Sequence, residues 1–318
     1  METDNLSSGT SPVIPAPEPP SLMSTVFLGP HGLRAGWRFA IYVAAFMVLR
    51  RVVLPYINAP LFPKSHNMPP LWVFLVWECE SLVAAVLPAL ALSRLEKRPF
   101  DEYGLPRKTA FGKNFWAGAV WGLVAISCLL LALRAAGTFY FGAIVLHGFR
   151  SLKFAVFWAV LFVVVGLFED FTFRGYSQFT LAEGIGFWPA AIMLSLAFGA
   201  VHLPQEKSAL GNQGEAWIGA LGAALIGLFF CLTLKRTGSL WFAVGMHASW
   251  DWGETFLYSV PNSGMTAPGH MMNPSFHGSR WLTGGSVGPE GSVLLFVLIA
   301  LMWILFDRVY PAKRTAEN

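Results

Sequence analysis

Residues 154–175 read FAVFWAVLFVVVGLFEDFTFRG, an apolar run that ends in three charged side chains. A membrane-spanning helix needs about 20 mostly apolar residues, and this run is long enough. Its charges are Glu169, Asp170 and Arg174. An ionisable side chain at the centre of a bilayer costs about 2.5–3.5 kcal/mol on insertion scales, so such residues usually face a bundle interior and serve a function there. The stretch therefore predicts a helical membrane protein with a polar interior.

The composition of the whole chain agrees with this interpretation. Hydrophobic residues make up 55% of the 318 residues and charged residues 13%, and the mean hydropathy is +0.54. Soluble domains carry about 25% charged residues, so the composition excludes a water-soluble globular protein. The net charge of +4 is spread over short loops rather than one patch, and we expect no nucleic-acid partner. The three cysteines lie in apolar spans without metal-ligand spacing.

The same length rule predicts an all-α, polytopic transmembrane bundle of about eight membrane-spanning helices. The expected spans lie near 37–57, 70–93, 115–136, 154–182, 187–203, 217–234, 240–258 and 291–310. Residues 1–30 are rich in Pro and Ser and predict a disordered tail, because they cannot form an apolar core. Residues 31–150 would hold accessory transmembrane helices 1–3, and residues 261–318 an extracytoplasmic loop and the last helix. Between them, residues 151–260 form the core that carries the polar motifs.

The distribution of Lys and Arg predicts the orientation. Six basic residues fall between the second and third spans, two more at Lys235 and Arg236, and others follow the last span. With eight spans these segments share one side with the N-terminus, and basic loops face the cytoplasm. The segment 259–290 has Arg280 as its sole Lys or Arg and falls on the other side. We expect both termini to be cytoplasmic.

Three polar clusters interrupt the apolar helices. In the first, Asp170 and Arg174 are four residues apart and share a helix face, which leaves Glu169 free. The second ends in His202, four residues after Phe198. The third holds His247 and Asp251, again four apart. Each cluster alone has a structural explanation: an ion pair at a helix end, a histidine bonded to a carbonyl, or a His–Asp contact that fixes packing.

The depth of these residues favours one shared site. Glu169 lies about 16 residues before a turn near Gly184–Gly186, and His202 about 17 residues after it. At 1.5 Å per residue both lie roughly 24–26 Å from the turn. His247 lies about ten residues past the turn that precedes its own span, so its depth matches that of Glu169 and His202 less closely. We predict that all three side chains converge on one polar cavity.

The clusters resemble the motifs of the CPBP family, the CAAX proteases and bacteriocin-processing enzymes. That family carries E-E-x-x-x-R, F-x-x-x-H and H-x-x-x-N or H-x-x-x-D on successive transmembrane helices. The matching residues are Glu169, Asp170, Arg174, Phe198, His202, His247 and Asp251. Residues 103–105 resemble a common family lead-in. The chain departs from the pattern at Asp170, where the family has a second Glu, and it ends the last motif in Asp251 rather than Asn.

The resemblance implies a multi-pass protease of the bacterial cytoplasmic membrane that hydrolyses a membrane-associated peptide or protein. Glu169, desolvated among apolar side chains, would act as general base on a water that His202 positions. His247, held by Asp251, would stabilise the oxyanion. Asp170, Arg174 and Phe198 would be supporting residues. No cofactor is required in this interpretation.

Three alternatives stay open. In a zinc protease, His202, His247 and Glu169 would bind the metal and leave one position for water. A non-catalytic bacteriocin-immunity or scaffold protein would also fit the family. A transporter with a proton relay is a further possibility, supported by Glu78 and Glu80 in the second span, although we find no inverted repeat. The two glutamates would otherwise make polar contacts between helices.

Overall fold

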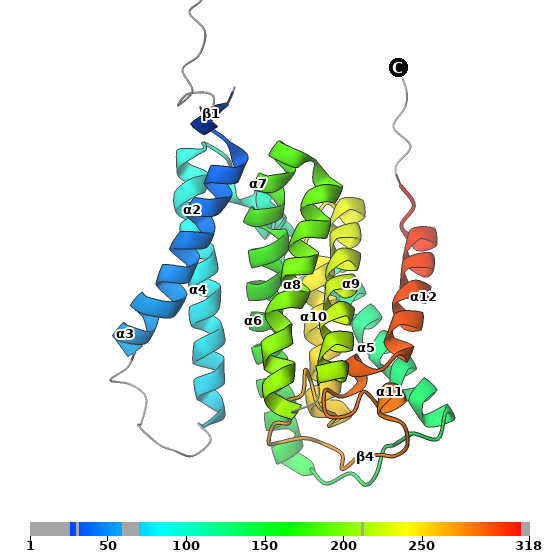
Figure 1. The fold of residues 1–318 in the computed structure, drawn as a ribbon. Helices are drawn as coiled ribbons and strands as arrows, with labels where there is room; N and C mark the ends of the chain where they lie inside the picture. The colour runs from blue at the N-terminus through cyan, green and yellow to red at the C-terminus, as the bar shows by residue number, and fades with distance from the viewer. Residues whose placement is uncertain (1–25, 30–31, 59–69, 211–212, 313–318) are drawn as a thin grey trace, which may run out of the picture.

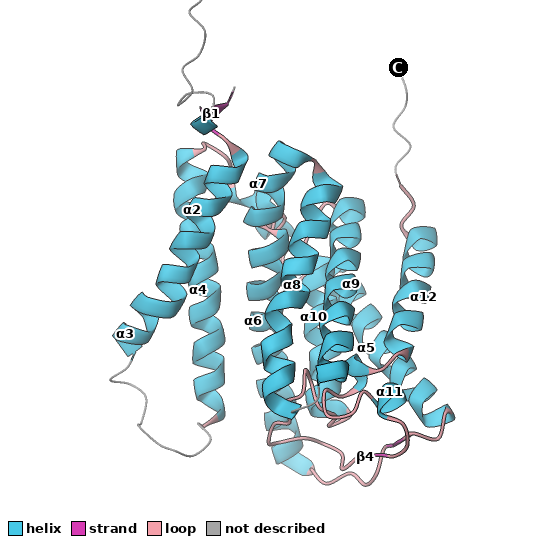
Figure 2. Ribbon diagram, viewed as in Figure 1, coloured by secondary structure: helices cyan, strands magenta, loops and turns pink. Residues whose placement is uncertain are grey.

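The computed structural model describes residues 26–29, 32–58, 70–210 and 213–312; the side chains of residues 204–210 and 213–215 are outside this description. Most of the predicted tail, residues 1–25, therefore lies outside it. Helices make up most of the described chain (Figures 1 and 2). Its main α-helices are α2 (Ala35–Val48), α3 (Leu54–Asn58), α4 (Leu71–Leu95), α5 (Lys113–Ala135), α6 (Gly148–Arg174), α7 (Tyr176–Ile185), α8 (Phe187–Leu210), α9 (Gln213–Thr237), α10 (Trp241–Trp252), α11 (Arg280–Thr283) and α12 (Leu294–Val309).

A helix occupies each of the eight predicted spans, and the chain is a polytopic helical membrane bundle. Within the described residues, five helical segments are long and apolar enough to cross a membrane: Ala35–Asn58, Leu71–Leu95, Lys113–Ala135, Gly148–Ile185 and Ala216–Thr237. The other three expected spans are shorter. They are Phe187–Leu203, α10 with its π-helical continuation η4 (Gly253–Leu257), and α12.

Two expected spans are less regular than predicted. The span expected at 154–182 consists of α6 and α7, which are separated at Gly175. A Cβ at Gly175 would lie 2.5 Å from the carbonyl oxygen of Phe171, so the tight break directly after the charged motif requires glycine. The first span contains a π-helical turn, η1 (Leu49–Val53), between α2 and α3.

The two ends of the bundle differ. Helix α2 begins and α12 ends at the same end, whereas the long loop segment before α12 lies at the opposite end (Figure 1). At that opposite end two short strands, β3 (Phe139–Tyr140) and β4 (Ser275–Phe276), pair antiparallel. This arrangement agrees with an even number of membrane crossings.

Helix α10 packs closely against α5 through small residues. A Cβ at Gly118 would lie 2.0 Å from the carbonyl oxygen of Phe242, and one at Gly122 would lie 2.2 Å from that of Met246. Glycine lets the backbones of membrane helices approach in this way. The contact fixes the position of the helix that carries the third polar motif.

The connection between α4 and α5 contains residues 103–105, which resemble the family lead-in, and holds them against the end of the bundle where α2 begins. A 3-10 turn, η2 (Phe100–Tyr103), precedes Gly104, whose φ of +90° favours glycine. The carbonyl oxygen of Gly104 accepts a 2.7 Å hydrogen bond from the backbone N–H of Leu240, just before α10. The Tyr103 hydroxyl donates to Glu96 at 3.1 Å. Burial, together with Glu96, raises the pKa of the Tyr103 phenol, so it remains a donor.

Candidate active site

The first polar motif forms a buried ion pair near the end of α6. Arg174 Nη1 lies 2.6 Å from Asp170 Oδ1, and the two side chains are 1% and 0% exposed. The i, i+4 spacing predicted this pair, and the structure confirms it. Removing two charges from water is costly unless they are paired and hydrogen-bonded, and Arg174 Nε also donates to the carbonyl oxygen of Gly227 at 3.2 Å.

Aromatic rings and a glycine enclose the Arg174 guanidinium. Its Cζ lies 4.4 Å from the ring centroid of Phe198 on α8 and 5.2 Å from that of Phe230 on α9, distances typical of cation–π contacts. A Cβ at Gly227 would lie 2.5 Å from Arg174 Nη2, so glycine makes room for the side chain. Arg174 thereby joins α6, α8 and α9 behind the site.

Glu169, one residue before this pair, faces the two histidines. Its Oε2 lies 3.9 Å from His202 Nε2 and 3.6 Å from His247 Nε2. The predicted convergence of these three residues is therefore confirmed. His202 Nδ1 lies 2.7 Å from the carbonyl oxygen of Phe198; a carbonyl can only accept, so Nδ1 carries the proton. In the neutral ring Nε2 is then an acceptor that faces Glu169.

His247 lies among three carboxylates. Its Nδ1 is 3.6 Å from Asp170 Oδ2, and its Nε2 is 3.6 Å from both Glu169 Oε2 and Asp251 Oδ2. Both ring nitrogens face carboxylate oxygens, and both can donate at once only in the imidazolium form. The ring centroid of Phe230 lies 5.8 Å from that of His247 and fixes one side of the ring.

The site opens into a cavity of about 620 Å³ whose lining includes Glu169, His202, His247 and Asp251. Apolar side chains from α4, α6 and α9 form much of its wall. Glu78 of α4 also lines it. Glu80 instead accepts a hydrogen bond from Asn58 and joins α3 to α4. The cavity therefore places polar, titratable groups inside an apolar bundle.

Comparison with known proteins agrees with the motif analysis. Residues 151–253 match the family model "Type II CAAX prenyl endopeptidase Rce1-like". This range runs from the first turn of α6 to the end of α10 and contains every residue of the three motifs. Residues 151–253 form an Rce1-like domain. No curated protein and no solved structure shows a significant match to the chain.

The Rce1-like domain includes two site residues that the motifs did not indicate, Gly227 and Phe230. Both lie on α9, which carries no polar motif. Glycine and phenylalanine in an apolar helix give no sequence signal of their own, because both are common in membrane spans.

The alternative zinc site would use Glu169, His202 and His247, and the Glu169 Oε2 atom lies 3.6 Å from Nε2 of His247 and 3.9 Å from Nε2 of His202. A zinc ion holds N and O ligands at about 2.0–2.2 Å. Among the described residues, the group that brings three potential ligand atoms within 4.8 Å of one another consists of other residues and does not include Glu169, His202 and His247 together. Zinc bound by this trio would require the side chains to move.

Proposed function

We propose that this protein is an intramembrane endopeptidase in which Glu169 activates water for hydrolysis of a peptide bond. The Rce1-like domain supports protease activity. The observation that carries the mechanism is the position of the Glu169 carboxylate, 3.6 and 3.9 Å from the Nε2 atoms of two histidines and inside a cavity. The substrate would be a membrane-associated peptide or protein, with a CAAX prenyl peptide as the first candidate.

Glu169 and His202 can hold one water between them. Their separation of 3.9 Å exceeds a direct hydrogen bond, and such gaps suit a bridging water. Both groups accept, so the water would donate one hydrogen to each and present its lone pair to a substrate carbonyl. Glu169 would take the proton as the water attacks and pass it to the leaving amine as the peptide C–N bond breaks. Such general acid–base catalysis typically contributes 10²–10⁴-fold to the rate.

His247 would stabilise the charge that develops on the carbonyl oxygen. Its Nε2 lies 3.6 Å from both Glu169 and Asp251, and the residue lines the cavity. A donor fixed before the reaction stabilises an oxyanion without reorganisation. Asp251, which when ionised cannot donate, would orient His247, and Asp170 would hold the other ring nitrogen.

The test is proteolysis by the purified protein in detergent, with quenched fluorescent peptides as substrates, including a prenylated CAAX peptide. We expect Glu169→Gln to reduce kcat by about 10²–10⁴-fold, because Gln keeps the shape and cannot accept the proton. Glu102→Gln is the matched control, since Glu102 is an exposed residue that pairs with Arg98 at 3.6 Å on the surface. It should keep wild-type activity.

Three outcomes would contradict the proposal. Full activity of Glu169→Gln would exclude Glu169 as the base. Stoichiometric zinc, together with activity that a chelator abolishes and zinc restores, would favour the zinc protease. The third outcome is that the wild-type protein cleaves none of the peptides and that Glu169→Gln binds them as the wild type does. This result would favour the non-catalytic immunity or scaffold role.

A further inference from the structure

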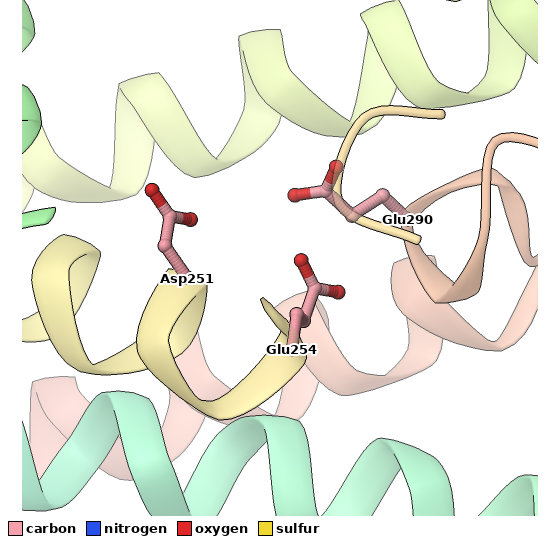
Figure 3. Close-up of side chains that lie close together, drawn as sticks. All are labelled: Asp251, Glu254 and Glu290. Carbon is pink, nitrogen blue, oxygen red and sulfur yellow. The ribbon is translucent and has the colours of Figure 1, made fainter. Parts of the chain in front are cut away.

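A second group of carboxylates lies beside the site. Asp251 on α10, Glu254 on η4 and Glu290 on the 3-10 turn η5 (Pro289–Gly291) each bring one oxygen atom within 4.8 Å of the others. Figure 3 shows Asp251 and Glu254 projecting from neighbouring turns of helix, with Glu290 reaching the same space from the loop before α12. Residues 39 positions apart in the chain thus converge.

Glu254 is fully buried, and its carboxylate has no hydrogen-bond partner in the described part of the chain. Its side chain is 0% exposed, and neither carboxylate oxygen has a hydrogen-bond partner among the described residues. The Trp250 indole lies alongside it but outside hydrogen-bond geometry. An unpaired buried carboxylate costs several kcal/mol, so a native structure that directs one into a shared space indicates a ligand there.

Glu290 is held in position for such a ligand. Its Oε2 accepts hydrogen bonds from the backbone N–H and the hydroxyl of Ser263, at 2.9 and 2.8 Å. Asp251 faces His247 at 3.6 Å, and no Lys or Arg of the described residues forms an ion pair with Asp251 or Glu254. Without a bound cation, these buried carboxyl groups would have to take up protons or repel one another.

The spacing and chemistry indicate which cation. Two ligands of one ion are at most twice the metal–oxygen distance apart, which is about 4.0–4.2 Å for Mg²⁺ and about 4.6–5.2 Å for Ca²⁺. The three oxygen atoms lie no more than 4.8 Å from one another. Mg²⁺ usually binds through one or two carboxylates, so a set of three carboxylates favours Ca²⁺. Three carboxylates are hard oxygen ligands, whereas zinc sites usually include His or Cys.

We propose that Asp251, Glu254 and Glu290 bind a calcium ion. The ion joins the end of the helix that carries His247 to the loop before α12. Asp251 and Glu290 line the cavity of the site, and so does Thr255; the cavity supplies the route of entry and room for water ligands. This site stands on its own geometry and does not depend on the proposed peptidase activity.

The experiment measures the binding of Tb³⁺, a luminescent substitute for Ca²⁺, to the purified full-length protein in detergent after divalent ions have been removed. Excitation of tryptophan should sensitise bound Tb³⁺, since Trp250 lies beside Glu254. We expect stoichiometric Tb³⁺ that Ca²⁺ displaces, and at least about tenfold weaker binding in Glu254→Gln and in Glu290→Gln, because each loses one charged ligand.

Glu78→Gln is the matched control, because it removes another carboxylate of the same cavity but not one of the cluster; it should bind Tb³⁺ as the wild type does. Glu169→Gln should also bind normally even if it abolishes proteolysis, which separates the two proposals. Failure of wild-type protein to bind Ca²⁺ at about 10 mM, above the weakest protein calcium sites, would overturn the proposal. Equal binding by wild type and both cluster variants would overturn it too.

Discussion

At the scale of single residues, neighbouring acidic side chains have separate environments. Glu169 faces the cavity and two histidines, whereas Asp170 is buried and pairs with Arg174. Because successive residues on a helix are rotated by about 100°, adjacent carboxylates can serve different purposes. One faces the cavity and the other holds the framework behind it.

This division leads to a prediction for Asp170→Asn. The change leaves the Arg174 charge buried, and breaking a buried pair by removing one partner costs about 3–5 kcal/mol. We therefore expect a strong fall in thermal stability in detergent, measured by loss of monodisperse protein on heating. The double variant Asp170→Asn with Arg174→Met should recover part of the loss, since it removes the stranded charge as well. Stability of Asp170→Asn equal to that of wild type would show that the pair is not a structural anchor.

Local spacing made part of this site predictable and left part of it hidden. Asp170 and Arg174 lie on one helix, so their separation in sequence determines their contact. The convergence of Glu169, His202 and His247 followed from depth, although the count placed His247 at a shallower level. The turn after α7 and the turn after α9 lie at the same end of the bundle but at different heights (Figure 1). A count of residues from each turn cannot detect that difference. Glu290 reaches its neighbours through a loop of irregular conformation, which no periodicity predicts.

At the scale of elements, glycine positions decide how closely helices approach. The Gly118 and Gly122 contacts bring the backbone of α5 against that of α10, while the break at Gly175 ends α6 directly after its charged motif. The sequence predicted the helices from their apolar length. It did not predict the break, because a glycine within an apolar run is common in membrane spans.

The close contact of α5 with α10 makes Gly122→Ala a sensitive test. The added Cβ would lie 2.2 Å from the backbone oxygen of Met246, and a backbone cannot rotate away as a side chain can. We expect a loss of about 1–3 kcal/mol from overpacking, seen as a lower midpoint of thermal denaturation. Gly36→Ala is the same substitution on α2 with no neighbouring atom within 4 Å of the new Cβ. It should be neutral or slightly stabilising; equal effects of both changes would refute the packing argument.

At the scale of the whole molecule, the basic connections and the long loop before α12 belong to opposite ends of the bundle. The charge distribution predicts that the end carrying Lys235 and Arg236 faces the cytoplasm. Reporter fusions after residues 105 and 312 should therefore give a cytoplasmic signal, and a fusion after residue 275 the opposite signal. Matching signals from the fusions at 105 and 275 would contradict the topology.

Hydrolysis consumes water, which the hydrocarbon core of a bilayer excludes. A cavity of about 620 Å³ has room for on the order of twenty water molecules at roughly 30 Å³ each. An incoming peptide segment would displace most of them and leave those that polar side chains hold most firmly. The cavity would thus act as a small reservoir, and the supply of the second reactant would not depend on diffusion through lipid. Substrates that fill the cavity too completely should behave as inhibitors, because they expel the water that the reaction needs.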